Sequence, residues 1–192
     1  REMVMKRMMT AALLLGLAVA AFPVGTVLEA DGLVEVRLDG RWEAISTGAS
    51  LPTTATVATG FRSRAVIELG SSVITIGPLS QVSLGDVAVG EREESVTLEM
   101  PFGEIRAEVK RARRASPERS VDFRVLSPVS TAAVRGTVFT YDGVELDVAE
   151  GRVDLMNGYG QWHSVGAGQE SRAYRWEIDS VETTAREAAG VD

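Results

Sequence analysis

The chain has 192 residues, with 27 acidic and 20 basic side chains, one histidine and no cysteine. Without cysteine there are no disulfides, thiol nucleophiles or thiolate metal sites, and a single histidine excludes a metal site built on a histidine pair. The net charge of -7 argues against nucleic acid as a partner, because such binding depends on Lys and Arg neutralising phosphates.

Residues 1–30 differ sharply from the rest of the chain and predict a segment for export. Lys6 and Arg7 precede an apolar run from Met8 to Phe22, which has the length of a signal-peptide core. We therefore expect residues 1–30 to form a signal peptide or a signal-anchor helix. In either case the remainder of the chain is expected outside the cytoplasm, that is, exported.

Two fates of this N-terminal segment remain open. Small residues suited to cleavage lie at Val19 and Ala21, and a weaker cleavage site ends at Ala30. Alternatively, Met8–Leu28 is retained as an anchor, because about twenty apolar residues are enough to cross a bilayer. Contact with a membrane is expected only through residues 8–28, and only if the segment is not cleaved.

From Asp31 onward, apolar and polar residues alternate, which is typical of strands with one buried and one exposed face. The polar member is usually charged, so a shift of one residue would bury charge, and the register of each strand is strongly specified. The predicted strands cover residues 34–38, 66–69, 72–76, 96–100, 105–109, 121–125, 144–148 and 153–155.

Turn residues separate these strands at intervals that are typical of an all-β domain. Asp142-Gly143 lies between two apolar runs and predicts a tight hairpin. Tyr174, Trp176 and Ile178 predict a final edge strand, so we interpret residues 171–192 as an edge strand followed by a tail. The other predicted turns are at Asp39-Gly40, Gly70-Ser71, Gly77-Pro78, Gly85-Asp86, Pro101-Phe102-Gly103, Asn157-Gly158 and Gly166-Ala167-Gly168.

Side chains suited to catalysis are few, and we expect no catalytic, metal-binding or cofactor-binding residue. His163 lies in an apparent strand, where a half-exposed position at a sheet edge is expected, not a role as a general base. Glu93 and Glu94 are adjacent, and neighbouring strand residues point to opposite faces, so a shared acid–base site is not expected. We interpret these two glutamates as part of a solvated loop.

Four basic residues in close succession form the most unusual charge feature of this acidic chain. Lys110, Arg111, Arg113 and Arg114 lie between two predicted strands. One interpretation is a docking loop for an acidic partner, an anionic lipid or a cell-wall polymer. The other is a solvated hairpin tip whose charges discourage pairing between sheet edges.

Three short motifs follow one another between Phe123 and Val153. Their residues are Phe123-Arg124-Val125-Leu126-Ser127-Pro128, then Ala132-Ala133-Val134-Arg135-Gly136-Thr137-Val138-Phe139, then Val148-Ala149-Glu150-Gly151-Arg152-Val153. This succession resembles the FecR domain family, whose pattern is roughly F-x-V-x-T-P, A-x-V-R-G-T-x-F and V-x-x-G-x-V. Ser127 stands where the family often has threonine, a change that keeps the hydroxyl group.

The resemblance implies one FecR-like all-β domain over residues 31–170, built of short, mostly antiparallel strands in a β-solenoid-like or sandwich-like arrangement. Arg135 is expected to cap carbonyl groups or to pair with a carboxylate. The alternative is that Arg135 and Thr137 line a binding groove. The residues of the family motif, which we expect to be mainly structural, are Ser127, Pro128, Val134, Arg135, Gly136, Thr137, Phe139 and Gly151.

The family resemblance also implies a signalling context, since the iron-uptake regulators of this family relay a receptor's state across a membrane to a sigma factor. The apolar segment begins at Met8, so we expect no sigma-binding segment here. Our prediction is a non-enzymatic, exported module that binds an envelope protein or a cell-wall polymer. The alternative is a periplasmic accessory in the regulation of metal (iron) uptake. A glycan hydrolase with paired carboxylates is a third candidate.

Overall fold

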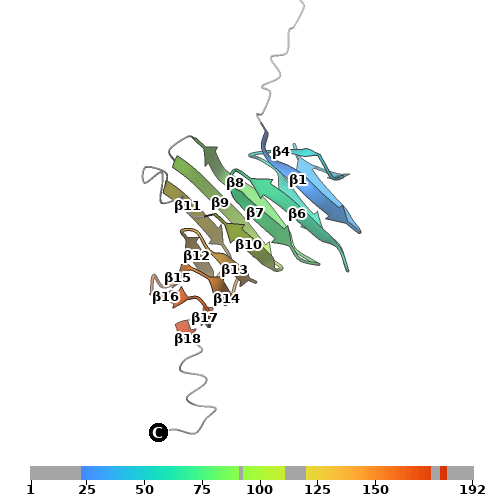
Figure 1. Ribbon diagram of the computed structural model, residues 1–192. Helices are drawn as coiled ribbons and strands as arrows, with labels where there is room; N and C mark the ends of the chain where they lie inside the picture. Colours follow the sequence, from blue (N-terminus) through green and yellow to red (C-terminus); the bar gives the residue numbers. More distant parts are fainter. Residues whose placement is uncertain (1–22, 91–92, 111–119, 174–177, 181–192) are drawn as a thin grey trace, which may run out of the picture.

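The computed structural model describes residues 23–90, 93–110, 120–173 and 178–180, which form eighteen strands in two nine-stranded sheets (Figure 1). Sheet A has the order β18-β17-β14-β13-β10-β7-β6-β1-β4, and sheet B has the order β16-β15-β12-β11-β9-β8-β5-β2-β3. The strands are β1 Pro23–Asp31, β2 Val34–Leu38, β3 Arg41–Ala44, β4 Ser50–Pro52, β5 Thr56–Thr59, β6 Arg64–Leu69, β7 Ser72–Ile76, β8 Gln81–Val89, β9 Glu93–Phe102, β10 Ile105–Val109, β11 Ser120–Leu126, β12 Ser130–Val134, β13 Val138–Tyr141, β14 Glu145–Glu150, β15 Arg152–Asn157, β16 Trp162–Gly166, β17 Gln169–Ala173 and β18 Ile178–Ser180.

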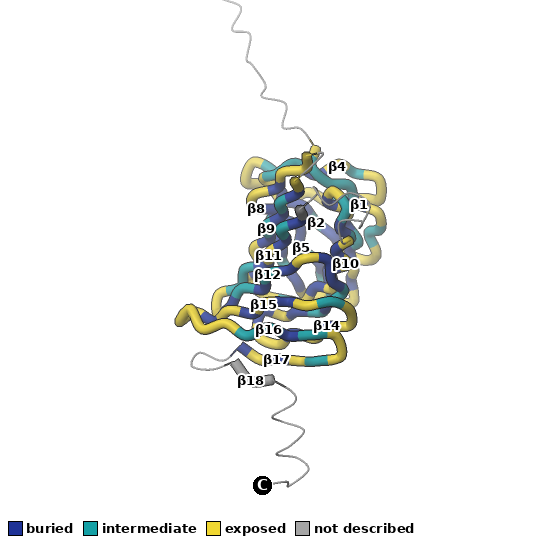
Figure 2. The backbone as a smooth tube through the Cα atoms, turned by 60° about the vertical axis from the view of Figure 1, so that its left-hand side comes forward, coloured by how far each residue is buried: buried dark blue, intermediate teal, exposed yellow. Residues whose placement is uncertain are grey.

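The two sheets pack face to face and enclose one continuous hydrophobic core. Along the strands, buried positions alternate with exposed or partly exposed ones (Figure 2), because successive side chains of a strand point to opposite faces. Aromatic side chains fill the middle of the core, where Phe123 of sheet B meets Phe139 of sheet A edge to face at 6.2 Å. The apolar alternation of the sequence therefore drives the pairing of the two sheets.

The chain builds the two layers by changing sheets after each hairpin. From β11 onward the strands change sheets in pairs. β11 and β12 lie in sheet B, β13 and β14 in sheet A, β15 and β16 in sheet B, and β17 and β18 in sheet A. Among the described strands, β9 and β11 form the one parallel pair, because β10 crosses to sheet A between them. This coiling combines a sandwich with features of a solenoid, and the prediction of an all-β fold with mostly antiparallel strands is confirmed.

Most sequence-predicted strands are present, and one predicted turn is wrong. The strands predicted at 34–38, 72–76 and 105–109 coincide with β2, β7 and β10, and Asp142-Gly143 joins β13 to β14. Gly85-Asp86 was expected to form a turn but lies inside β8, where the register with β9 shifts between Leu84 and Val87. The one extra residue of β8 is accommodated as a bulge, and bulges in strands commonly contain glycine.

The domain begins earlier than the sequence analysis expected. β1 starts at Pro23 and pairs with β4 and β6, and its Val27 is only 1% exposed in the core. The boundary predicted at residue 30 is therefore wrong, and so is a membrane span that extends to Leu28, because residues 23–30 belong to sheet A. The remainder of the predicted signal or anchor segment, residues 1–22, lies outside the described residues.

At the C-terminal end, β18 is the edge strand of sheet A and pairs with β17. The predicted edge strand is thus present at Ile178–Ser180, whereas Tyr174 and Trp176 lie outside the described residues. The predicted tail, residues 181–192, lies outside them as well. Among the residues that the structure does describe, no helix is long and apolar enough to span a membrane.

Candidate functional site

The V-R-G-T motif forms the corner at which the chain leaves β12 of sheet B and enters β13 of sheet A. Gly136 has a φ of 72°, a left-handed conformation that costs an L-residue about 1 kcal/mol or more. Thr137 follows as a bridge to β10, since its N–H donates to the Val109 carbonyl at 2.9 Å and its carbonyl accepts from the Val109 N–H at 2.8 Å. The chain next changes sheets at Gly151, between β14 and β15. The Thr137 hydroxyl links the two corners, because it donates a hydrogen bond to the Arg152 carbonyl at 3.2 Å.

The S-P motif forms a second structural joint, on the opposite side of the sandwich. The Ser127 hydroxyl donates to the Gly143 carbonyl at 2.8 Å, which ties the β11–β12 turn to the β13–β14 turn. Ser130 and Tyr141 complete this network inside the core, and both are buried. Burial raises the pKa of the Tyr141 phenol, while its hydrogen bonds to Ser127 and Ser130 oppose the shift. The hydroxyl that Ser127 keeps is therefore used to join the two sheets.

The outer face of sheet B carries a groove of about 610 Å³ beside the V-R-G-T corner. It runs along β12, whose outward side chains Thr131 and Ala133 are small and form the floor. The neighbouring strands supply longer side chains that form the walls. These are Asp122 and Arg124 from β11, Arg152, Asp154 and Met156 from β15, and Trp162 from β16.

The strand register places these wall residues at defined levels along the groove. Ala133 is the register partner of Arg124 on one side and of Asp154 on the other. Near one end, Thr131 pairs with Met156, and Met156 pairs with Trp162. These two side chains are 42% and 71% exposed, and because their strands pair at this position they form one contiguous apolar patch. This end of the groove, formed by Met156 and Trp162, is its apolar end.

Two arginines form the other end of the groove, its cationic end. Val134 pairs with Val153, so Arg135, which follows Val134, and Arg152, which precedes Val153, begin at the same level. Both side chains are exposed. Within the described residues, no ion pair or hydrogen bond engages either guanidinium group. Arg124, in contrast, is held by Asp122, to which its Nε and Nη2 donate at 3.1 and 2.7 Å.

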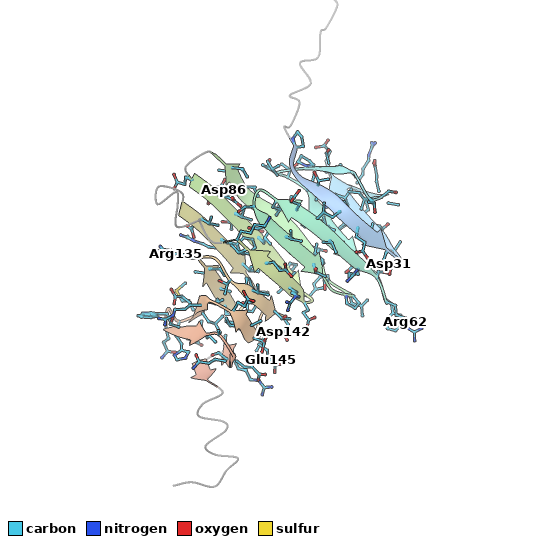
Figure 3. All side chains as sticks on the ribbon, viewed as in Figure 1. Asp31, Arg62, Asp86, Arg135, Asp142 and Glu145 are labelled. Atoms are coloured by element: carbon cyan, nitrogen blue, oxygen red, sulfur yellow. The ribbon has the colours of Figure 1, made fainter. Side chains whose placement is uncertain are left out.

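The structure separates Arg135 from Thr137, the two motif residues that the alternative interpretation placed together in one binding groove. Arg135 lines the groove and extends from the side of the sandwich opposite Asp142 and Glu145 (Figure 3). Thr137 is 2% exposed, lies in the corner and borders a separate hollow on sheet A, not this groove. The carbonyl cap or ion pair predicted for Arg135 is not found in the described part of the chain.

The remaining members of the family motif take structural positions. Val134 and Phe139 are 1% and 0% exposed and lie in the core. Pro128 is in the exposed β11–β12 turn, beside the network formed by Ser127. The structure therefore uses most of the motif to connect the sheets, and it leaves Arg135 facing solvent.

Glu94 is not in a solvated loop, as the sequence analysis proposed. It lies in β9 at 0% exposure, and its carboxylate accepts from the Ser71 N–H at 2.9 Å and from the Ser71 hydroxyl at 2.7 Å. Glu93 is exposed on the other face of β9, so the expected separation of the two carboxylates is confirmed. Alternation alone did not reveal Glu94, because a glutamate in a strand usually marks the exposed face.

His163 lies where it was expected, partly exposed in β16, which is the edge strand of sheet B. Sequence reasoning missed Trp162 and Met156 as site residues. Their positions on one outer face follow only from the pairing of β15 with β16. The described residues contain no cluster of three or more His, Asp or Glu side chains arranged to hold a metal ion.

The predicted basic docking loop lies mostly outside the described residues. Arg111, Arg113 and Arg114 belong to residues 111–119. Lys110 is described, and with Glu108 and Glu150 it lines a separate hollow of about 540 Å³ on the outside of sheet A. The groove on sheet B, which is lined entirely by described side chains and includes Arg135 of the family motif, is taken as the candidate site.

Comparison with known proteins places the central part of the chain in a recognised family. The model of the family described as "FecR protein" matches residues 55–158, which include most of sheet B and the whole V-R-G-T corner. A comparison with curated proteins found no match.

Two solved structures resemble the fold. Both are crystal structures described as a "putative anti-sigma factor" from Parabacteroides distasonis ATCC 8503. One is 13% identical, with a TM-score of 0.51 over 65% of this chain and 58% of the solved chain. The other is 14% identical, with a TM-score of 0.52 over 69% of this chain and 63% of the solved chain. The present chain therefore spans about three-fifths of the length of these proteins, and the likeness concerns the fold.

Proposed function

Because this chain belongs to the FecR protein family, we propose that it is an exported, non-enzymatic binding module that takes part in signalling across a membrane through a protein partner. The groove on the outer face of sheet B is the binding site of this proposal. The observation that carries it is the exposure of Trp162, at 71%, in a groove that also contains Arg135 and Arg152, whose guanidinium groups form no ion pair with any described residue. Tryptophan and arginine are the residues most enriched at the centres of protein interfaces.

The signalling role rests on the family and on the description of the two similar structures as putative anti-sigma factors. Asp122, one of the two carboxylates in the groove, is already engaged by Arg124, which favours recognition over acid–base chemistry at this site. The periplasm is the compartment that we propose for this domain, in keeping with the apolar N-terminal segment.

A site-specific photo-cross-linking experiment in the native host tests this function. A photoreactive amino acid replaces Ala133 on the groove floor, and a matched control replaces Thr140, which is also partly exposed but lies in β13 of sheet A. We expect one discrete cross-linked protein from position 133 in the envelope fraction and none from position 140.

A double variant tests whether the cross-link depends on the groove. The substitutions Arg124→Ala and Trp162→Ala together remove one wall side chain on each side of β12. They should abolish the cross-link from position 133, while the amount of folded protein stays unchanged. A cross-link that persists in this variant, or one that forms equally well from position 140, contradicts the proposal. The absence of any partner protein at position 133 contradicts it as well.

A further inference from the structure

We propose that the groove on sheet B binds an extended acidic peptide segment of the partner, with a carboxylate at the cationic end and an aromatic or aliphatic side chain at the apolar end. The inference rests on the proposed function, because it names the chemistry of the partner that the same groove takes. It follows from three properties of the groove, which are its width, its charge and the position of its apolar side chains.

The width of the groove corresponds to one extended chain. β11 and β15 flank β12, so the two rows of wall side chains start two strand spacings apart, about 9.6 Å. The floor between them is low because Thr131 and Ala133 have short side chains. A peptide in β conformation that lies along β12 can therefore rest on this floor, with alternate side chains directed into the groove.

The charge of the groove selects a carboxylate. Arg124 is neutralised by Asp122, which leaves Arg135 and Arg152 against the single carboxylate of Asp154. Two guanidinium groups that start from the same level form a clamp for a carboxylate, because each presents parallel N–H donors. On a chain with a net charge of -7, this local positive end also attracts an acidic segment to the groove.

The opposite end of the groove favours an apolar side chain elsewhere in the same bound peptide. Trp162 and Met156 lie together because their strands pair at this position. Both are exposed, and burying them against a partner removes apolar surface from water. The distance from the level of Arg135 to the level of Thr131 is four residue steps, about 13 Å for an extended chain. An acidic and an aromatic residue four positions apart in the peptide therefore reach both ends at once.

Synthetic peptides test this pairing directly. The probe is a blocked peptide with glutamate and phenylalanine four positions apart, joined by Thr-Ser-Thr, and binding is followed by fluorescence polarisation at low and high salt. The control peptides carry glutamine in place of glutamate, alanine in place of phenylalanine, or the acid and the aromatic residue only two positions apart. We expect the probe to bind at least about ten-fold more tightly than each control peptide, and salt to weaken its binding.

Protein variants assign the two contacts to the two ends of the groove. Arg135→Gln and Arg152→Gln should each weaken binding of the probe by about ten-fold and should abolish its preference over the glutamine peptide. Trp162→Ala should abolish the preference for phenylalanine but keep the preference for glutamate. Arg106→Gln is the matched control, because Arg106 is a half-exposed arginine on the outer face of sheet A. It should leave binding unchanged.

Several outcomes overturn the inference. Equal binding of the glutamate and glutamine peptides does so, and so does an Arg135→Gln protein that binds the probe normally. Binding of peptidoglycan fragments in the groove, with no binding of the peptide probe, identifies a glycan site instead. If position 133 cross-links to a partner whose contacting segment contains no acid, the proposed function stands and this inference fails. If position 133 cross-links to no protein at all, both fail.

Discussion

The hydroxyl oxygen of Tyr141 lies 2.6 Å from the Oγ of Ser130, and this hydrogen bond joins β13 of sheet A to β12 of sheet B inside the core. The Gly143 carbonyl accepts from the Ser130 hydroxyl at 2.8 Å. Because both side chains are buried, their polar atoms depend on each other for hydrogen bonds that water would otherwise supply. The two sheets are therefore held together by specific polar contacts as well as by apolar packing.

Replacing Tyr141 by phenylalanine should destabilise the domain without changing its fold. The change removes the phenolic hydroxyl and keeps the ring, so we expect the free energy of unfolding to fall by about 1–2 kcal/mol. Urea denaturation followed by tryptophan fluorescence measures this value. Ser46→Ala, at an exposed serine, is the control and should stay within about 0.5 kcal/mol of the parent. A Tyr141→Phe protein as stable as the parent would show that the network contributes nothing.

The same residue predicts a loss of stability at alkaline pH. Burial raises the pKa of Tyr141 above its ordinary value of 10.0, so the folded protein keeps the proton at a pH where the unfolded chain releases it. Its contribution to stability is therefore full below about pH 10 and is lost as the pH rises through the folded-state pKa. Denaturation between pH 8 and pH 11 should show a steeper decline for the parent than for Tyr141→Phe. Parallel curves would contradict the expected shift.

Glu94 and Glu93 offer a matched test of the buried carboxylate. Glu94→Ala leaves the N–H and hydroxyl of Ser71 without their acceptor, so we expect a loss of about 2–3 kcal/mol in the free energy of unfolding. Glu93→Ala, at the exposed neighbouring position, should change stability by less than about 0.5 kcal/mol. Thermal and urea unfolding of both variants provide the comparison. Similar losses at the two positions would mean that Glu94 is not buried as described.

Alanine substitutions at two glycines with left-handed backbone conformations distinguish the cost of backbone strain from the cost of steric overlap. Gly40 has a φ of 80° and open space where a methyl group would lie, so Gly40→Ala should cost about 1 kcal/mol. Gly103 has a φ of 102°, and a methyl group there would overlap the backbone of Ser80, whose hydroxyl is fixed by the Glu104 N–H at 2.9 Å. We expect Gly103→Ala to cost about 3 kcal/mol or more. Equal stabilities of the two variants would refute the close approach.

Truncations test where the folded domain begins. A chain that starts at Pro23 retains β1 and should fold with the stability of the parent domain. A chain that starts at Asp31 loses Val27 from the core and exposes β4 and β6, so it should unfold at clearly lower denaturant concentration or fail to fold. Circular dichroism and urea denaturation distinguish these results. Equal stability of the two truncated chains would place the start of the domain at residue 31 after all.

Local patterns of the sequence were sufficient to predict much of the fold. The alternation in residues 34–38 and 105–109 predicted β2 and β10 with their correct bounds, because burial of one face repeats every second residue. Asp142-Gly143 likewise predicted its hairpin. The same rules failed at Gly85, where a bulge and a turn use the same residue types, and at Pro23–Ala30, whose apolar composition fits a leader segment as well as a buried strand.

The sequence by itself determined that the chain forms one all-β domain with a FecR-type motif and few side chains suited to catalysis, since these properties depend on residue type and local spacing. Only the tertiary structure decided that Arg135 and Trp162 belong to one groove and that Thr137 does not. The reason is physical, because the groove depends on which strands pair and in which register. Pairing of β12 with β15 and of β15 with β16 brings together residues that are far apart in the chain, through contacts that no local pattern encodes.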